Sequence, residues 1–195
     1  MTPAEARDAG LEALRELAAE GGREAARTVG RMVGREAGVG EVQLVQGPDT
    51  AGVLRMIGRP DTELVAVAME IQEPVGGTLL LAVAADEAER VAQTLVPDAA
   101  AGSLDAVGES ALVEVGNVAG SAFVSALARR LHVRMIHGVP HLTRGKPRAC
   151  LDALAPGAAG PALGVRFGCP EASGTLLLLP DPRRIEALAG ALEAR

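Results

Sequence analysis

The chain has 195 residues, of which 48% are hydrophobic, 23% are charged and only 1% are aromatic. This hydrophobic fraction excludes a disordered chain, and the length suits one domain or two small halves that share a core. The formal net charge of -6 argues against a nucleic-acid partner, and the scarcity of aromatic rings leaves little for bases to stack on.

The N-terminal part of the chain predicts a long helix, then extended segments, then a short helix. In chain order these elements cover 3–37 (helix), 41–46, 63–72 and 77–85 (extended) and 86–95 (helix). Gly38 and Gly40 are expected to end the long helix, and Asp86 is placed to cap the short one.

The rest of the chain predicts a similar order of elements. A second long helix is expected over about 107–131, strands over 132–138, 149–154, 162–169 and 174–180, and a closing helix over 181–194. Asp181 is placed to cap the closing helix, with Pro182 in its first turn.

Two pairs of segments indicate that the chain repeats itself. GTLLLAVAADEAERVAQTL (77–95) parallels GTLLLLPDPRRIEALAGAL (174–192) with an offset of 97 residues. ALRELAAEGG (13–22) matches ALVEVGNVAG (111–120) with an offset of 98 residues. An offset of nearly constant length, found twice, indicates a duplicated unit and not a solenoid.

The repeat defines the predicted architecture. We expect a single domain over 1–195 that consists of two related halves, about 1–97 and 104–195, with one continuous core. Because strands follow strands within each half, the sheet should be mostly antiparallel, in an α+β fold.

The second long helix has an unusual polar face. With Leu112 set at 0° and a turn of about 100° per residue, the apolar residues within about 60° are Val115, Ala119, Phe123, Ala126 and Leu127. Four polar residues fall on the opposite side, at about 140–200°: Ser110, Glu114, Asn117 and Ser121. This polar line should point to solvent or to a partner.

Two interpretations of the polar line stay open. Any amphipathic helix has a solvated face, which is the simpler explanation. Against it, Ser and Asn are mediocre helix formers at exposed positions, and the line carries no Lys or Arg to pair with Glu114. Residues that disfavour a helix and form no stabilising local interaction in exchange are typical of a functional site.

The spacing of these residues resembles the motif of the CheC family of chemotaxis phosphatases, which includes CheX and the flagellar-switch protein FliY. The family motif reads [acidic/S]-x3-E-x2-N-x22-P, and Ser110, Glu114, Asn117 and Pro140 have this spacing. EVGNVAGSA (114–122) is also similar to the family's consensus sequence EIGN-(I/V)-AG. The resemblance covers essentially the whole chain and is closest to CheC. It implies a pseudo-twofold duplicated α-β unit with two long helices packed on the sheet.

The resemblance implies a hydrolase that removes the phosphoryl group from the aspartate of a CheY-type response regulator. An acyl phosphate is already activated, so catalysis mainly requires a water molecule held in line with the phosphorus. Asn117 would orient that water, and Glu114 would pair with a lysine in the regulator's active site. Mg²⁺ would be held by the regulator's carboxylates, so this chain is expected to need no cofactor or metal of its own. Ser110, Ser121 and Pro140 are assigned to the contact with the regulator, Pro140 by shaping the loop or strand beside the helix.

The first half departs from the motif. On the 98-residue offset, Ala19 stands where the motif has Asn and Val42 where it has Pro, whereas Glu16 matches the Glu. A methyl group cannot position a water molecule, so one working site is expected, in the second half. Glu16 is interpreted as a surface charge, and the alternative is a remnant of an ancestral site.

The resemblance also implies a possible second partner, a CheD-type receptor deamidase. The alternative function is therefore non-catalytic: a CheC-like adaptor that binds a CheD-type deamidase or the flagellar switch. The presence of both Glu114 and Asn117 favours the enzyme. The degenerate first half leaves the adaptor function as an alternative.

Other polar residues carry weaker signals. The spacings of His132, His137 and His141 cross a helix end, a strand and a loop, so a metal site is not expected. Cys150 and Cys169 are outside any metal spacing and are expected to be reduced thiols, with a disulfide as the alternative.

Four arginines recur at every fourth position of the first predicted helix: Arg23, Arg27, Arg31 and Arg35. Interleaved with Glu, they are expected to keep the helix soluble, and a docking surface for an acidic partner is the alternative. No apolar run approaches about 20 residues, and the start MTPAEARDAG lacks the features of a signal peptide. The predicted location is the cytoplasm, without membrane insertion.

Overall fold

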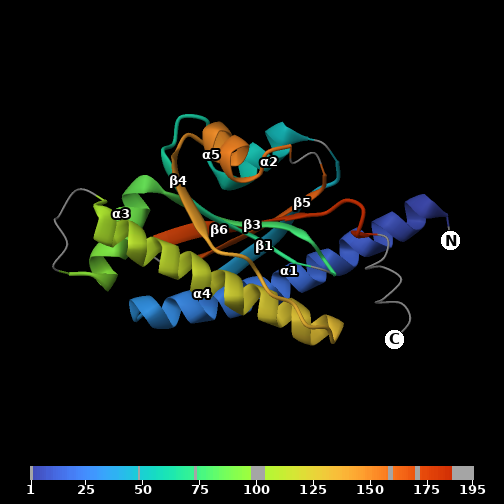
Figure 1. Ribbon diagram of the computed structural model, residues 1–195, viewed down its shortest axis with the longest axis horizontal. Helices are drawn as coiled ribbons and strands as arrows, with labels where there is room; N and C mark the ends of the chain where they lie inside the picture. Colours follow the sequence, from blue (N-terminus) through green and yellow to red (C-terminus); the bar gives the residue numbers. More distant parts are fainter. Residues whose placement is uncertain are drawn as a thin grey trace.

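The computed structural model describes residues 2–47, 49–72, 74–97, 104–157, 160–169 and 172–185. These residues form a sheet of six antiparallel strands that lies between two layers of helices (Figure 1). The long helices α1 (Pro3–Val33) and α4 (Ala106–Leu131) cover one face, and the short helices α2 (Thr50–Ile57) and α5 (Pro147–Leu154) cover the other. The predicted α+β class, with an antiparallel sheet and two long helices packed on it, is confirmed.

The order of the strands shows the internal duplication. The remaining elements are β1 (Gly38–Val45), β2 (Leu64–Glu70), β3 (Gly77–Ala84), α3 (Ala85–Leu95), β4 (His141–Gly145), β5 (Ala162–Cys169) and β6 (Ala172–Pro180). The sheet runs β1-β5-β6-β3-β2-β4. Exchanging each strand with its counterpart in the other half (β1 with β4, β2 with β5, β3 with β6) reproduces the same order read backwards. A pseudo-twofold axis therefore passes between β3 and β6, as the repeat in the sequence predicts.

The two halves of the chain exchange their edge strands. β1, from the first half, pairs with β5 of the second half, and β4, from the second half, pairs with β2 of the first. At the centre, β3 and β6 pair along their length, from Gly77 opposite Pro180 to Val83 opposite Gly174. The exchange joins both halves into one sheet, so that each face has a continuous core.

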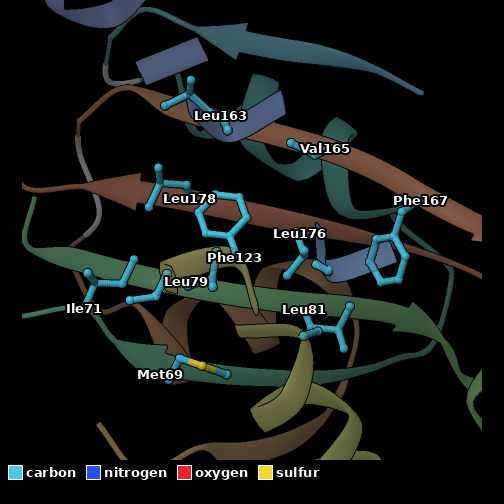
Figure 2. Close-up of a cluster of buried hydrophobic side chains, with 14 of the residues drawn as sticks. Met69, Ile71, Leu79, Leu81, Phe123, Leu163, Val165, Phe167, Leu176 and Leu178 are labelled. Atoms are coloured by element: carbon cyan, nitrogen blue, oxygen red, sulfur yellow. The ribbon is translucent and has the colours of Figure 1, made fainter. Parts of the chain in front are cut away.

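The sheet separates two clusters of buried side chains. Alternate residues of β2 belong to opposite faces: Val67 and Met69 join the cluster under α1 and α4, whereas Ala66 and Ala68 join the cluster under α2 and α5. Burial on both faces explains why the β2 sequence is apolar without alternation. Figure 2 shows the larger cluster, where the ring of Phe123 from α4 lies over leucine side chains of β3 and β6.

The first helix ends earlier than the sequence predicts. Gly34 follows Val33 in the left-handed conformation, with φ 68°, and its N–H group reaches the carbonyl oxygens at the end of the helix. Glycine adopts this conformation without the steric cost of a Cβ, so the helix stops here. The predicted ends at Gly38 and Gly40 are wrong, because both glycines lie in β1.

Both short helices differ from the sequence prediction. The predicted strand over 149–154 is wrong, because this segment belongs to α5, which begins at Pro147 and buries Cys150 and Leu151. The sequence pattern does not predict α2, although Asp49 caps it by accepting a hydrogen bond from the third residue of the helix at 2.9 Å. Of the predicted strand over 132–138, the structure has one isolated bridge, at His137.

The two predicted aspartate caps have different outcomes. Asp86 does not cap α3, because the helix begins directly after β3 and Asp86 instead pairs with Arg90 at 3.1 Å. The Asp181 carboxylate does accept a hydrogen bond from the backbone N–H of Arg183, at 3.0 Å. The closing helix predicted over 181–194 lies outside the described residues beyond 185.

Helix α4 is the one helix of the described ranges that is long and apolar enough to cross a membrane by length and composition alone. Its most apolar window has a mean hydropathy of 1.5, although polar residues such as Glu114 and Asn117 interrupt the apolar sequence. Half of that window is buried inside the fold, and the core helix of a packed domain meets the same criteria. The packing of α4 on the sheet accounts for its apolar side.

Candidate functional site

Helix α4 is held close to the sheet and forms a rigid platform. Asp105 caps its first turn, accepting a hydrogen bond from the N–H of Gly108 at 2.8 Å. A Cβ atom at Gly116 would lie 2.6 Å from Cγ1 of Val67 in β2, so only glycine permits this approach. A Cβ atom at Gly120, one turn later, would lie 2.9 Å from Cε of Met69, also in β2. These glycines set the distance between α4 and the sheet. The opposite side of α4 faces away from the sheet.

The structure places the four residues of the polar line on this outer side. Ser110, Glu114 and Ser121 are exposed and Asn117 is half-buried, whereas Val115, between them in sequence, is only 4% exposed. The helix face calculated from the sequence is thus the face that the fold leaves outward.

Glu114 and Asn117 lie side by side on this face. Nδ2 of Asn117 donates a hydrogen bond to Oε2 of Glu114 at 3.4 Å, a long and therefore weak bond. The described part of the chain provides no other hydrogen bond to either side chain. A carboxylate and a carboxamide thus point outward together, and both can change partners at little cost. Such a pair can bind a cation with one group and orient a water molecule with the other.

The first turns of α4 are joined to the neighbouring strand β4. The guanidinium of Arg144 forms an ion pair with Glu109 at 2.8 Å. Ser110, next to Glu109, donates its hydroxyl hydrogen to the carbonyl oxygen of Ala106 at 2.9 Å. The Ser110 oxygen is left with outward lone pairs, so it can accept a hydrogen bond from a partner.

Ser121 at the other end of the line makes a contact that the sequence did not predict. Its Oγ lies 2.8 Å from Nε2 of His137, and Nδ1 of His137 lies 2.9 Å from the carbonyl oxygen of Gly138. Pro140, which is half-buried, follows on the same segment immediately before β4. The structure therefore brings Ser121 and the segment of Pro140 together. From the sequence, His137 was considered only as a metal ligand.

The corresponding region of the first half lies on α1. Glu16 is exposed and Ala19 is half-buried, and both line a depression between α1 and the end of α4, where Arg130 and His132 lie. The methyl group of Ala19 offers no hydrogen bond, so this region lacks the pair of side chains that Glu114 and Asn117 form.

The structure shows where the histidine and cysteine residues lie. No three His, Cys, Asp or Glu side chains are arranged to hold a metal ion in the ranges that the structure describes. His132 ends α4 in the left-handed conformation, with φ 53°. Cys150 and Cys169 are both free thiols. Burial raises the pKa of the Cys150 thiol, and the charge of Glu63 adds to this effect.

No protein-family model and no curated protein matches the sequence. Solved structures do match the fold. FliY from Thermotoga maritima aligns with a TM-score of 0.70 at 15% identity, over 100% of this chain and 98% of FliY. The FliM middle domain from H. pylori aligns with a TM-score of 0.62 at 13% identity, over 93% of this chain and 97% of that domain.

CheX from Borrelia burgdorferi, solved as a complex with CheY, BeF3 and Mg, aligns with a TM-score of 0.58 at 19% identity. The alignment covers 83% of this chain and 96% of CheX. Similarity at this level of identity is a statement about the fold. This chain has the CheC/CheX/FliY fold.

Proposed function

We propose that this protein is a cytoplasmic CheC-type phosphatase that hydrolyses the phosphoaspartate of a CheY-type response regulator in chemotaxis signalling. The observation that carries the proposal is the pair formed by Glu114 and Asn117, one turn apart on the outer side of α4 and joined at 3.4 Å. A CheX protein with the same fold has been solved with CheY bound. The motif spacing from Ser110 to Pro140 supports the same substrate class.

The reaction transfers a phosphoryl group from aspartate to water. The water oxygen bonds to phosphorus while the bond from phosphorus to the aspartate oxygen breaks. The products are the regulator's carboxylate and inorganic phosphate, which keeps the protons of the water. Because the aspartyl carboxylate is a good leaving group, orientation of the water matters more than removal of its proton.

Asn117 orients the attacking water in this proposal. Its carbonyl oxygen accepts a hydrogen bond from the water, and its amide can donate one without any change of charge. The side chain is half-buried at the surface of a helix packed on the sheet, which restricts its motion. A water held there loses its freedom of orientation before the reaction, which lowers the entropic part of the barrier.

Glu114 orients the docked regulator. On docking, its carboxylate exchanges the weak bond to Asn117 for an ion pair with a lysine in the regulator's active site, and this frees the amide of Asn117 for the water. Mg²⁺ belongs to the regulator, whose carboxylates hold it in this proposal. With Ala19 in place of Asn, the first half takes no part in the chemistry.

The proposal is tested by the decay of a phosphorylated CheY-type regulator with and without this protein. The wild type should accelerate the decay, and Asn117→Ala should lower the acceleration by about 100-fold, because the water is no longer held in line. Ser125→Ala is the matched control, since Ser125 is exposed on the same helix beyond the polar line. A wild-type protein that leaves the decay unchanged would contradict the proposal.

The second candidate function is a non-catalytic adaptor that binds a CheD-type deamidase or the flagellar switch. FliY and the FliM middle domain align with this chain with TM-scores of 0.70 and 0.62, which supports this candidate. The missing asparagine in the first half favours the same alternative. Binding to either partner without any effect on the phosphorylated regulator would identify the adaptor.

A further inference from the structure

We propose that Ser121 and His137 form a hydrogen-bonded pair that positions the segment 136–140 beside Asn117, and that the rate of regulator dephosphorylation depends on this pair. The inference rests on the proposed phosphatase function. His137 is then a positioning residue, because it acts through the geometry of the site without touching the phosphoryl group.

The hydrogen-bond partners of His137 define the tautomer of its neutral ring. The carbonyl oxygen of Gly138 can only accept, so Nδ1, 2.9 Å away, carries the hydrogen. In the neutral ring Nε2 is then an acceptor, and the Ser121 hydroxyl, at 2.8 Å, donates to it. Both ring nitrogens are therefore used, and the ring is held in one orientation.

The bond made by Ser121 is unusual for a hydroxyl in the middle of a helix. Ser110, Thr28 and Thr94 donate to the carbonyl oxygen four residues earlier in their own helices, at 2.9, 2.8 and 2.8 Å. The corresponding carbonyl for Ser121 belongs to Asn117. Ser121 instead bonds to a side chain 16 residues away, so its hydroxyl serves a tertiary contact.

The main chain around His137 is attached to the end of β2. The N–H of Gln72 donates to the carbonyl oxygen of Ile136 at 3.0 Å, and the N–H of Gly138 donates to that of Glu70 at 2.8 Å. The His137 side chain then crosses to α4. The segment is thus fastened at two points, to β2 through its backbone and to α4 through the ring, and Pro140 follows three residues later.

The first half of the chain offers an internal comparison. On the 98-residue offset, Arg23 corresponds to Ser121 and Val39 corresponds to His137. Arg23 and Val39 line one depression beside α1, so these two positions are again near each other, but their side chains cannot form the bond. The half that keeps the asparagine keeps the pair, and the half with Ala19 lacks both.

The position of the pair predicts which kinetic constant it affects. Ser121 lies one turn beyond Asn117 on the same line of α4, and its hydrogen bond to His137 brings the segment 136–140 next to that turn. If the segment shifts, the docked phosphorus and the water held by Asn117 no longer lie in line, and a misplacement of about 1 Å can cost up to 100-fold in rate. Such a change lowers kcat and leaves KM nearly unchanged.

The test measures the rate of dephosphorylation as a function of regulator concentration. Ser121→Ala and His137→Ala should each lower kcat by about tenfold and change KM by less than about twofold. The double variant should be no slower than the slower single variant, because both changes remove the same bond. Ser121→Thr and His137→Gln, which keep a donor and an acceptor, should restore most of the rate, and Ser125→Ala should match the wild type.

A second measurement tests the pair without the regulator. In ¹⁵N nuclear magnetic resonance spectra, His137 should have its hydrogen on Nδ1, and the Nε2 signal should shift in Ser121→Ala. Two outcomes with an active wild type overturn the inference. One is that the single variants keep the full kcat, and the other is that the losses in kcat of the single variants add in the double variant. A wild type that does not accelerate the decay overturns the proposed function, and with it the kinetic role of the pair. The two failures are therefore distinguished by the wild-type rate.

Discussion

The crossing of α1 and α4 depends on a glycine opposite a buried ring. A Cβ atom at Gly21 would lie 2.6 Å from Cδ2 and 2.8 Å from Cε2 of Phe123, whose side chain is only 1% exposed. In Gly21→Ala the ring or the helix must therefore move. Overpacking of this kind costs about 1–3 kcal/mol, and alanine returns about 1 kcal/mol of helix propensity relative to glycine. The overpacking cost exceeds the gain in helix propensity, so we expect the free energy of unfolding to fall by up to about 2 kcal/mol.

Thermal unfolding followed by far-ultraviolet circular dichroism measures this change. For a chain of this length the melting temperature should fall by up to about 8 °C. Ala13→Gly, at a half-buried position of the same helix, serves as the control for helix propensity alone. In the double variant Gly21→Ala/Phe123→Leu the smaller side chain makes room, so the combined loss should be smaller than the sum of the single losses by about 1 kcal/mol or more. A more stable Gly21→Ala variant, or strictly additive losses, would refute the reasoning.

Three further predictions concern the surface and the thiols. Asn117→Ala should lower phosphatase activity by about 100-fold and leave the melting temperature within about 2 °C of the wild type, because the hydrogen bond from its side chain to Glu114 is long and weak. Hydrogen bonds from the side chain and backbone of Arg183 lower the pKa of Asp181 from 3.8 to about 2. The stability that this carboxylate contributes is present above pH 3.8 and is lost as the pH falls to about 2, so Asp181→Asn should flatten acid unfolding in that window. The raised pKa and burial of Cys150 predict that a thiol reagent at neutral pH modifies Cys169 first and Cys150 only on unfolding, and that Cys169→Ser removes the fast phase.

The polar line of α4 could be predicted because, in a regular helix, the spacing of two residues along the sequence determines the angle between their side chains. Residues at positions such as 110, 114, 117 and 121 share one face of any regular helix, whatever lies around it. The repeat was predictable for a similar reason, since the matching segments retain both their order and their offset. The polar line and the repeat are local or periodic features, so a single sequence is enough to detect them.

Short elements could not be assigned in the same way. The eight residues of α5 make about two turns, too few for a helical period to stand out from the alternation of a strand. Pro147 was the available signal, because proline suits the first turn of a helix. At the end of α1 the sequence offers too many signals, because several glycines follow one another closely. Only the backbone conformation of Gly34 decides where the helix stops.

The role of His137 could not be inferred from the sequence because it depends on a distant strand. Its ring meets Ser121 only because the backbone of residues 136–138 pairs with the end of β2, more than sixty positions earlier in the chain. No spacing along α4 contains that information. Contacts between segments far apart in sequence are set by the sheet, and the sheet is known only from coordinates.

The exchange of β1 and β4 between the halves has an evolutionary consequence. A gene encoding one half would make a polypeptide whose outermost strand has no neighbour within itself, and two such molecules would have to complete each other as a symmetric homodimer. Joining two such copies in one chain removes the requirement that both be identical. One copy can then lack the asparagine that the other keeps, and the degenerate half is still needed to complete the sheet of the other half.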